Sequence, residues 1–318
     1  MPTRVKGLLS AMLSAACYGC SPVLALGLYA LNFDAANALF YRYFIAALMM
    51  LPILALKKET LTISMADLKA LAFPGIFFAL STLTYFVSFN YMNAGISATI
   101  LFLYPVFTAL IMVFAYHEKI SWFMILAMIL SLAGVILLHH AEVGGLSLIG
   151  TLLAIASALT YALYIVGINR THLLISNEKL TFYLILFSIA ITGIYMLCSP
   201  TSAIAIPDEP LEYLFLCLLA LVPTIISLEL LNVAIAGIGT TLTAILGALE
   251  PLTAVALSVL FFDEDISFNL AMGIGLIVGG VLIVIGGERF KARRARVFVK
   301  RFNFIIRKTV RRRWRWKS

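Results

Sequence analysis

Ten apolar stretches, most of them about 20 residues long, constrain this chain more than any other feature of its sequence. A helix needs roughly 20 apolar residues to cross a bilayer, whereas a membrane strand needs only about 9–11. A helix also satisfies its own backbone hydrogen bonds, which hydrocarbon demands. With 63% hydrophobic and 12% charged residues, the composition is far from that of a soluble domain. We expect spanning helices at 7–31, 35–56, 70–92, 94–116, 121–138, 146–168, 180–198, 211–233, 239–262 and 268–287.

The ninth stretch repeats the fourth. Residues 242–267 align without a gap on residues 96–121, at an offset of 146, and seven of the 26 pairs are identical. The identical pairs are Ala98/Ala244, Leu103/Leu249, Pro105/Pro251, Val113/Val259, Glu118/Glu264, Ile120/Ile266 and Ser121/Ser267. The first and sixth stretches correspond at an offset of 143, with Ala11/Ala154, Ser14/Ser157, Ala15/Ala158 and Tyr18/Tyr161 identical. This internal duplication indicates that the first stretch is a retained span rather than a cleaved signal peptide.

Lys and Arg residues indicate how the spans are oriented. If the N-terminus is inside, the inner loops and the two termini hold every basic residue outside the spans, and the five outer loops hold none. This bias predicts cytoplasmic N- and C-termini. Because each copy has an odd number of spans, the second copy then inserts upside down relative to the first, as in many secondary transporters.

These features predict an all-α polytopic membrane protein whose ten transmembrane helices form two inverted five-helix repeats. Residues 1–140 form the first repeat with helices 1–5, and residues 146–287 form the second with helices 6–10. Residues 288–318 form a basic cytoplasmic tail. We expect a multi-pass protein of a bacterial plasma (inner) membrane.

Several motifs carry a family resemblance. The fourth and ninth spans, YPVFTALIMVFAYHEKIS and LEPLTAVALSVLFFDEDIS, share a proline and a terminal glutamate. The fifth and tenth have the cores LAGVILL and VGGVLIVIG, and the sixth begins GTLLAIASALTYALY. Over about residues 7–287 the chain resembles the drug/metabolite transporter superfamily, specifically its EamA type of two tandem five-helix repeats. The resemblance implies transport of a small organic solute without ATP hydrolysis, often as export; members handle amino acids, nucleosides, sugars and drugs.

Glu250 is the leading candidate for a functional group, because it lies near the middle of the ninth span. Ionisable side chains there cost about 2.5–3.5 kcal/mol on insertion scales and are functional by default. Hydrocarbon favours the neutral form of a carboxyl group, which suits proton coupling or cation binding. Pro251 is expected to kink the helix and free the carbonyl of Gly247, and Pro105 to kink the fourth span. The alternative is that Glu250 pairs with a polar neighbour and only supports helix packing.

Arg42 lies in the second span, roughly 12 Å below its outer end, and its role is open. It binds a substrate carboxylate or holds Glu250 ionised, or its long stem extends to the outer interface and does nothing specific. Glu229 lies nearer the cytoplasmic end of the eighth span. We expect it to reach interfacial water rather than to line an inner vestibule.

Aromatic and amide side chains are candidates for the wall of a substrate cavity. They are Tyr18, Tyr85, Tyr104, Tyr161, Tyr164 and Asn90. Tyr104 takes the place of Glu250 in the first copy, so a site there is asymmetric. Each tyrosine is also common in packing and at interfaces. Gly275 and Gly279 in the tenth span permit close helix contact, within the monomer or in a homodimer.

The sequence contains little that favours an enzyme. Cys17 and Cys20 have C-x-x-C spacing, but they lie within a span and have no second pair to complete four ligands, so we expect no metal and no cofactor. The chain contains no phosphate-binding glycine loop, no Gly-x-Ser-x-Gly elbow and no His-Glu-x-x-His.

The tail from residue 289 to 318 has 14 basic and no acidic residues. Such a run is able to bind nucleic acid. Here it directly follows a span on the inner face, where anionic lipids attract each basic side chain by about 1 kcal/mol. Interleaved Phe, Ile, Val and Trp residues suit a segment lying in the interface. We therefore expect contact with anionic lipids, with a regulatory partner as the second option, and no nucleic acid.

The sequence thus predicts a secondary transporter that moves a small organic metabolite, such as an amino acid or related compound, by alternating access, driven by protons or another gradient. The alternative is a non-transporting membrane anchor or scaffold that presents its polybasic tail to a cytoplasmic partner or to anionic lipid.

Overall fold

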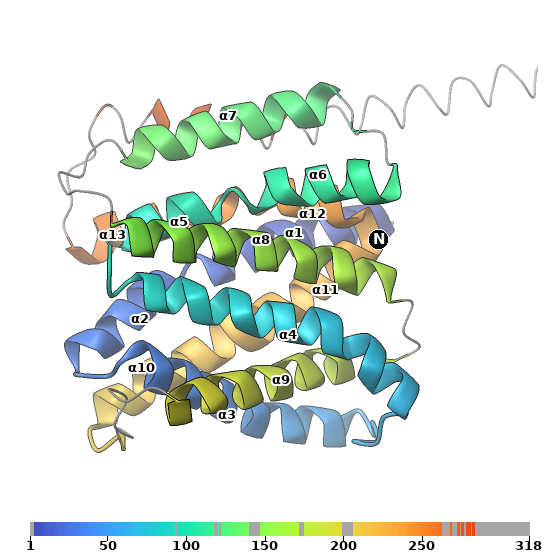
Figure 1. Cartoon of the computed structure of the whole chain (residues 1–318), viewed down its shortest axis with the longest axis vertical. Coiled ribbons are helices and arrows are strands. Elements are labelled where there is room, and N and C mark those ends of the chain that lie inside the picture. Colours follow the sequence, from blue (N-terminus) through green and yellow to red (C-terminus); the bar gives the residue numbers. More distant parts are fainter. Residues whose placement is uncertain are drawn as a thin grey trace, which may run out of the picture.

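The structure, a computed structural model, describes residues 3–92, 94–117, 120, 122–139, 147–171, 175–198 and 206–262, with short pieces between 268 and 283. Regular structure in these residues is entirely helical, and the long helices run side by side as a bundle (Figure 1). The elements are α1 (Thr3–Tyr18), α2 (Ser21–Ala30), α3 (Ala35–Leu56), α4 (Met65–Ser88), α5 (Ala94–Leu101), α6 (Tyr104–Tyr116), α7 (Trp122–His139), α8 (Leu148–Arg170), α9 (Asn177–Cys198), α10 (Pro210–Ala220), the π-helix η1 (Leu221–Ile226), α11 (Ser227–Ile238), α12 (Thr240–Leu246) and α13 (Leu249–Phe262).

Six segments of the described chain are long and apolar enough to cross a membrane. They are Thr3–Ala30, Ala35–Leu56, Met65–Ser88, Leu148–Arg170, Asn177–Cys198 and Pro210–Ile238. α6 and the first part of α7 are shorter apolar helices. The prediction of an all-helical, multi-pass membrane protein is therefore confirmed. Half of the expected tenth helix, 268–287, and all of the tail, 288–318, lie outside the described residues.

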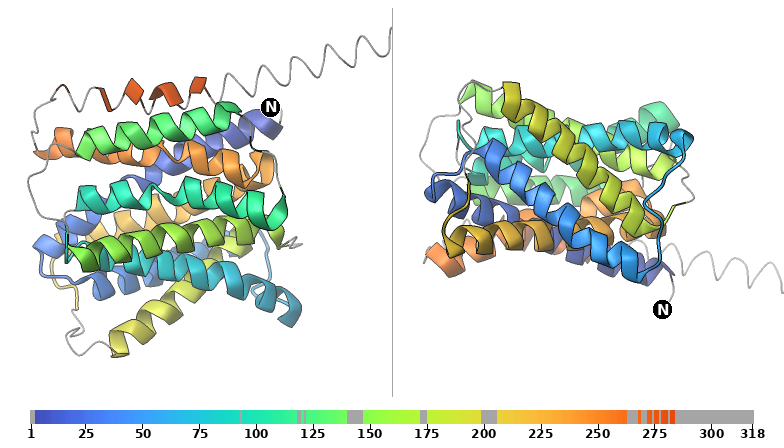
Figure 2. Two further views of the ribbon diagram at one scale, coloured as in Figure 1. Left: turned by 45° about the horizontal axis from the view of Figure 1, so that its top comes forward. Right: turned by 90° about the horizontal axis from the view of Figure 1, so that it is seen from below.

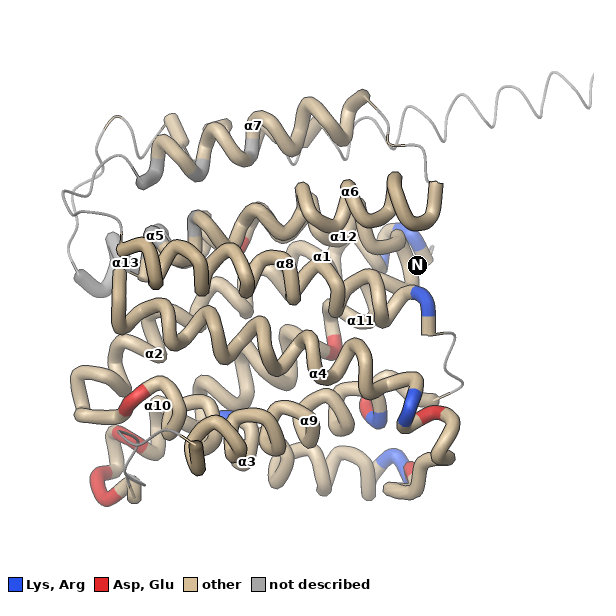
Figure 3. Tube along the Cα trace, viewed as in Figure 1, with Lys and Arg blue, Asp and Glu red and all other residues tan. Residues whose placement is uncertain are grey.

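The helices with the longest shared interfaces form the centre of the bundle. α4 packs along α8, and α1 packs along α11. α3 and α9 pack together at one edge, and α7 lies at the other edge against α5 and α12 (Figures 1 and 2). Charged positions gather near the helix ends, with Lys and Arg mainly at the end where the N-terminus lies (Figure 3).

Local side chains fix where several helices begin. The Asp34 carboxylate accepts a hydrogen bond from the backbone N–H of Asn37 at 2.7 Å and so caps α3. Ser64 caps α4 and Ser147 caps α8 in the same way. Such caps satisfy backbone donors that have no partner within the helix. They place the helix starts at the polar positions between apolar stretches.

Four expected spans are interrupted rather than continuous. The first divides into α1 and α2, the fourth into α5 and α6, and the ninth into α12 and α13, while the eighth contains η1. Pro22, Pro105 and Pro251 each lie in the first turn after a break, where the missing N–H costs no helical hydrogen bond. Pro223 lies inside η1. The kinks predicted at Pro105 and Pro251 are therefore full breaks.

The carbonyl of Gly247 is not free, so that prediction was wrong. The N–H of Glu250 donates to it at 2.8 Å. The prediction assumed a kinked but continuous helix, in which the missing proline N–H leaves a carbonyl unpaired. The chain instead turns at residues 247–248, and the turn brings a different donor to the same oxygen.

One interhelical contact occurs twice. Ser14 Oγ, in α1, donates to the carbonyl oxygen of Ser227, in α11, at 2.8 Å. Ser157 Oγ, in α8, donates to the carbonyl oxygen of Ser81, in α4, at 2.7 Å. Both pairs also have their hydroxyl oxygens 3.2 Å apart. Ser14 and Ser157 correspond at the offset of 143, and Ser81 and Ser227 differ by 146, the offset of the fourth and ninth spans. Small polar residues of this kind allow helices in a membrane to approach closely.

Candidate functional site

The two spans that are broken at the same aligned place meet through one hydrogen bond. Tyr104, at the start of α6, donates through its hydroxyl to Oε1 of Glu250, near the start of α13, at 3.2 Å. The two residues are 146 positions apart, which is the offset of the duplication. Tyr104 is buried and Glu250 is partly buried. Each copy of the repeat therefore supplies one half of a polar pair inside the bundle.

A narrow cavity lies beside Glu250. It has room for about one water molecule. Its wall comes from the α1–α2 break, α4, α5 and α13. The lining residues are Tyr18, Gly19, Pro22, Tyr85, Ala98, Leu101, Glu250, Pro251 and Ala254. The carboxylate thus faces a cavity with mainly apolar and aromatic walls, in which a polar ligand group has few competing partners.

Two glycines make this close packing of the breaks possible. A Cβ added at Gly19 would lie 2.5 Å from the carbonyl oxygen of Glu250, and one added at Gly247 would overlap the Tyr104 hydroxyl. Sequence reasoning did not single out either residue as part of the site. The signal was available: each glycine precedes a proline at a span break, Pro22 or Pro251, by three or four residues.

Three of the predicted tyrosines lie together around the pair. The rings of Tyr18 and Tyr161 are stacked, with centroids 6.0 Å apart and 17° between their planes. Tyr161 also meets Tyr104 edge to face at 4.8 Å. Tyr18 and Tyr161 correspond at the offset of 143, so a second pair of equivalent residues is in contact. Tyr164 continues the cluster, with its ring 5.7 Å from that of Tyr161.

Arg42 does not extend to the interface, so that alternative was wrong. Its side chain is 0% exposed. Nε donates to Oγ1 of Thr224 at 2.6 Å, and Nη2 donates to the carbonyl oxygen of Pro223 at 3.1 Å. The π-helix η1 provides both acceptors within the membrane body, and this removes the need to reach water. The guanidinium carbon lies 6.0, 5.4 and 5.5 Å from the ring centres of Tyr18, Tyr43 and Phe86.

Asn90 is not part of this cavity. α4 ends at Ser88, so Asn90 falls in the turn before α5 and its side chain is exposed. The apolar stretch continues past the end of the helix, which places Asn90 in an exposed turn, and its part in a substrate cavity stays a prediction.

Glu229 also differs from expectation. The Nδ2 group of Asn177 donates to its carboxylate and to its backbone carbonyl. Its other carboxylate oxygen, Oε1, is buried. The side chain therefore does not simply reach interfacial water, because α9 packs beside α11 and covers it.

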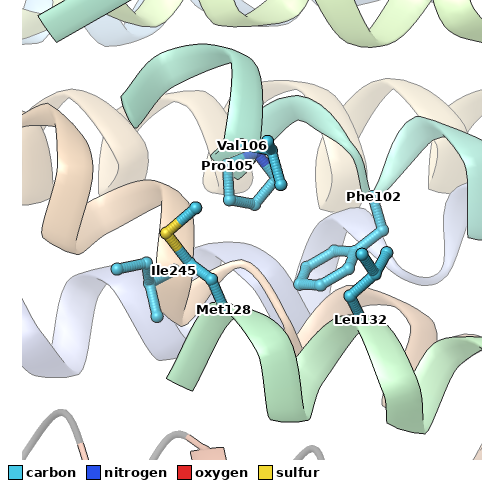
Figure 4. A pocket seen from close by; sticks show the side chains of 6 residues that line it. All are labelled: Phe102, Pro105, Val106, Met128, Leu132 and Ile245. Carbon is cyan, nitrogen blue, oxygen red and sulfur yellow. The ribbon is translucent and has the colours of Figure 1, made fainter. Parts of the chain in front are cut away.

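A second small cavity is entirely apolar. It lies between α6, α7 and α12 and is lined by Phe102, Pro105, Val106, Met128, Leu132 and Ile245 (Figure 4). Without a polar group in its wall, it cannot fix the orientation of a polar ligand. We therefore interpret it as loose packing beside the break at Pro105.

The predicted close contact at Gly275 and Gly279 involves none of the residues that the structure describes. A Cβ added at either residue would meet no atom within 4 Å among the described residues. Whether the contact forms within the monomer or in a homodimer therefore stays a prediction. The cysteines of the C-x-x-C motif, Cys17 and Cys20, are free thiols, and the Cys20 thiol donates to the carbonyl of Ala16 at 3.6 Å.

Together, these features define a class: a polytopic helical membrane protein with a duplicated body and a polar pair buried where the two copies meet. Comparison with known proteins gives the family. The sequence model of the EamA-like transporter family matches residues 5–139 and again residues 148–286. The chain therefore belongs to the EamA-like transporter family, within the drug/metabolite transporter superfamily, and is a membrane transporter of that family.

Individual relatives agree with this assignment. The chain is 27% identical over 224 residues to a protein named "Uncharacterized transporter YvbV" from Bacillus subtilis (strain 168), covering 69% of this chain and 70% of that protein. A protein of known crystal structure has a similar fold, with a TM-score of 0.77 and 18% identity, over 92% of this chain and 99% of its own. The structural similarity concerns the fold alone.

Proposed function

We propose that the protein is a secondary transporter with ten membrane-spanning helices in two inverted five-helix repeats. It moves a small organic metabolite, such as an amino acid or related compound, through a site at Glu250 by alternating access. The hydrogen bond between Tyr104 and Glu250 carries this proposal, because it joins equivalent positions of the two copies. Transporters of the inverted-repeat kind bind their substrates where the repeats meet.

A two-fold relation between the copies accounts for several contacts at once. A residue near a two-fold axis meets its own counterpart, as Tyr18 meets Tyr161 and Tyr104 meets Glu250. A contact away from the axis recurs with its partners exchanged, as the two serine contacts do. If both termini are cytoplasmic, five spans in each copy place this axis in the membrane plane. The site then lies at equal depth from both faces.

The chemistry of the site supports gradient coupling through Glu250. Among the described residues the carboxylate has one side-chain hydrogen-bond partner, the Tyr104 hydroxyl, and it faces the narrow cavity. A proton or a cationic group of the substrate binds the same oxygen atoms, so the two compete. The other titratable side chains around it are tyrosines 18, 85 and 161. The broken helices on both sides of the pair allow the halves to move relative to each other.

Transport by the protein in proteoliposomes tests this role. The solute is first identified by comparing the metabolite profiles of cells with and without the protein. We expect Glu250→Gln to remove the dependence of its flux on a proton gradient. The matched control is Asp208→Asn, which makes the same chemical change at an exposed carboxylate and is expected to behave as wild type. Unchanged gradient dependence in Glu250→Gln would reject the coupling role.

The remaining partners follow from the same proposal. The protein lies in a bacterial plasma (inner) membrane with both termini in the cytoplasm, the tail contacts anionic lipids, and Gly275 and Gly279 are available to a second copy. The rival function is an anchor that presents the tail to a partner. Deleting residues 289–318 separates the two, because a transporter keeps its flux and an anchor loses its activity.

A further inference from the structure

Arg42 is a buried cation whose hydrogen bonds are incomplete. Nε and Nη2 have acceptors in Thr224 and Pro223. Nη1, which carries two N–H groups, is buried and has no hydrogen-bond partner among the residues that the structure describes. An arginine side chain remains charged under all ordinary conditions. A donor group of this kind, left unpaired inside a protein, is costly unless something else binds to it.

In the described part of the chain, no acidic side chain neutralises this charge. Among the described residues, no carboxylate forms an ion pair with Arg42. The carboxylate of Glu250 is bonded to Tyr104 instead. The acceptors that Arg42 does have, a hydroxyl and a carbonyl, are neutral. A buried charge without a counterion is strongly unfavourable, so an anion bound at Nη1 would be stabilised there.

Tyr18 connects Arg42 to the cavity beside Glu250. Its ring forms part of the cavity wall, and its centre is 6.0 Å from the Arg42 guanidinium carbon. Tyr85, another wall residue, is the chain neighbour of Phe86, whose ring also lies against the guanidinium. The guanidinium of Arg42 and the cavity of the proposed transport site therefore share one neighbour, Tyr18.

We propose that Nη1 of Arg42 binds the anionic group of the transported solute, and that this solute carries a carboxylate. The inference rests on the proposed transport function and specifies its substrate class. Carboxylate oxygens are strong acceptors for guanidinium donors. Glu250, on the other side of Tyr18, is left to bind a proton or a cationic group.

A purely structural role for Arg42 makes a different prediction. In that case the residue only holds η1 in place through Thr224, and removing either partner has the same consequence. Thr224→Val removes the acceptor of Nε and keeps the positive charge and the free Nη1. Arg42→Gln removes the charge. Arg42→Lys keeps the charge with fewer donors and provides a second variant if Arg42→Gln does not reach the membrane.

The experiment compares cells that express the full-length wild type or one of these variants at matched membrane levels. Metabolite profiles of cells and medium first identify the solutes whose distribution depends on the wild type. Their flux is then measured with the free acid and with its methyl ester as competitors. We expect the solutes to carry a carboxylate and the free acid to compete about tenfold or more better than the ester, the ratio that a charge-assisted hydrogen bond gives.

Arg42→Gln is expected to remove this preference for the free acid, Arg42→Lys to keep part of it, and Thr224→Val to keep it even where flux falls. The proposal is overturned if the wild-type-dependent solutes lack an anionic group. It is also overturned if Arg42→Gln retains the preference, or if Thr224→Val abolishes it as completely as Arg42→Gln does. If no solute depends on the wild type, the transport function itself fails, which is a distinguishable result.

Discussion

The fourth and ninth spans share a backbone plan and differ in chemistry. Both are broken at the aligned place, and both have a proline in the first turn of their second half. Where the first copy has Leu101 and Tyr104, the second has Gly247 and Glu250. The glycine leaves space for the Tyr104 hydroxyl, which then reaches the carboxylate. The two copies therefore share a backbone frame, and the residues at two aligned positions make the contact between them a polar pair.

Exchanging the two polar residues gives the largest expected effect. Tyr104→Glu combined with Glu250→Tyr places the new tyrosine opposite Leu101, whose side chain fills the space that Gly247 leaves open in the other copy. We expect flux to fall roughly tenfold or more, because the exchange both breaks the hydrogen bond and crowds the new tyrosine against Leu101. Adding Leu101→Gly should restore part of it. Full flux in the double variant would show that the asymmetry between the copies is unimportant.

Gly247→Ala is expected to have the next largest effect. The added methyl group overlaps the Tyr104 hydroxyl, and overpacking of this kind costs about 1–3 kcal/mol. The melting temperature of the purified protein in detergent should fall. Gly193→Ala is the control, because its Cβ would lie 3.6 Å from the nearest side-chain atom, at ordinary contact distance. Equal melting temperatures for the two variants would contradict the close packing of the breaks.

Tyr104→Phe removes one hydrogen bond and little volume. A typical intramolecular hydrogen bond contributes about 0.5–1.5 kcal/mol, so the thermal shift should be smaller than for Gly247→Ala. The ring contact with Tyr161 is kept. A double-mutant cycle with Glu250→Gln measures the coupling between the two side chains. Additive effects on stability would indicate that the hydrogen bond contributes nothing.

The serine contacts give the smallest effect and compare the two halves directly. Side-chain hydrogen bonds between membrane helices contribute about 0.6 kcal/mol on average. We expect Ser14→Ala and Ser157→Ala to lower the melting temperature slightly and by similar amounts, because each removes the same contact from one copy. A clear difference between the two changes in melting temperature would mean that the two copies pack differently, although their helices are arranged alike.

Much of this arrangement could be predicted from sequence, because hydrophobic length and internal repetition are chemical properties of the chain itself. The offset of 146 paired Tyr104 with Glu250 as equivalent positions. It could not predict that they touch, since equivalent residues meet only near the boundary between the copies. The prolines at 105 and 251 indicated where the helices deviate. Whether each deviation is a kink or a full break depends on the turns just before them, at residues 102–103 and 247–248.

The surroundings of Arg42 and Asn90 could not be predicted, because they depend on contacts and helix ends that the local sequence pattern does not show. From the sequence, the Arg42 side chain could point into the bundle or extend to the outer interface. The acceptors that hold it inside the bundle belong to η1, about 180 residues away in the chain. A π-helix has no simple sequence signature. Asn90 lies in a turn because the helix ends before the apolar stretch does.

The accessibility of the two aligned positions His117 and Asp263 tests the central claim most directly. His117 ends α6, and Asp263 is its counterpart at the offset of 146. Each is replaced by cysteine in a chain whose four natural cysteines are serine, and intact cells are treated with a membrane-impermeant thiol reagent. Two inverted repeats around one site predict that the cysteine at 263 is labelled from outside and the one at 117 only after the membrane is opened. Labelling of both from the same side would contradict the inverted arrangement.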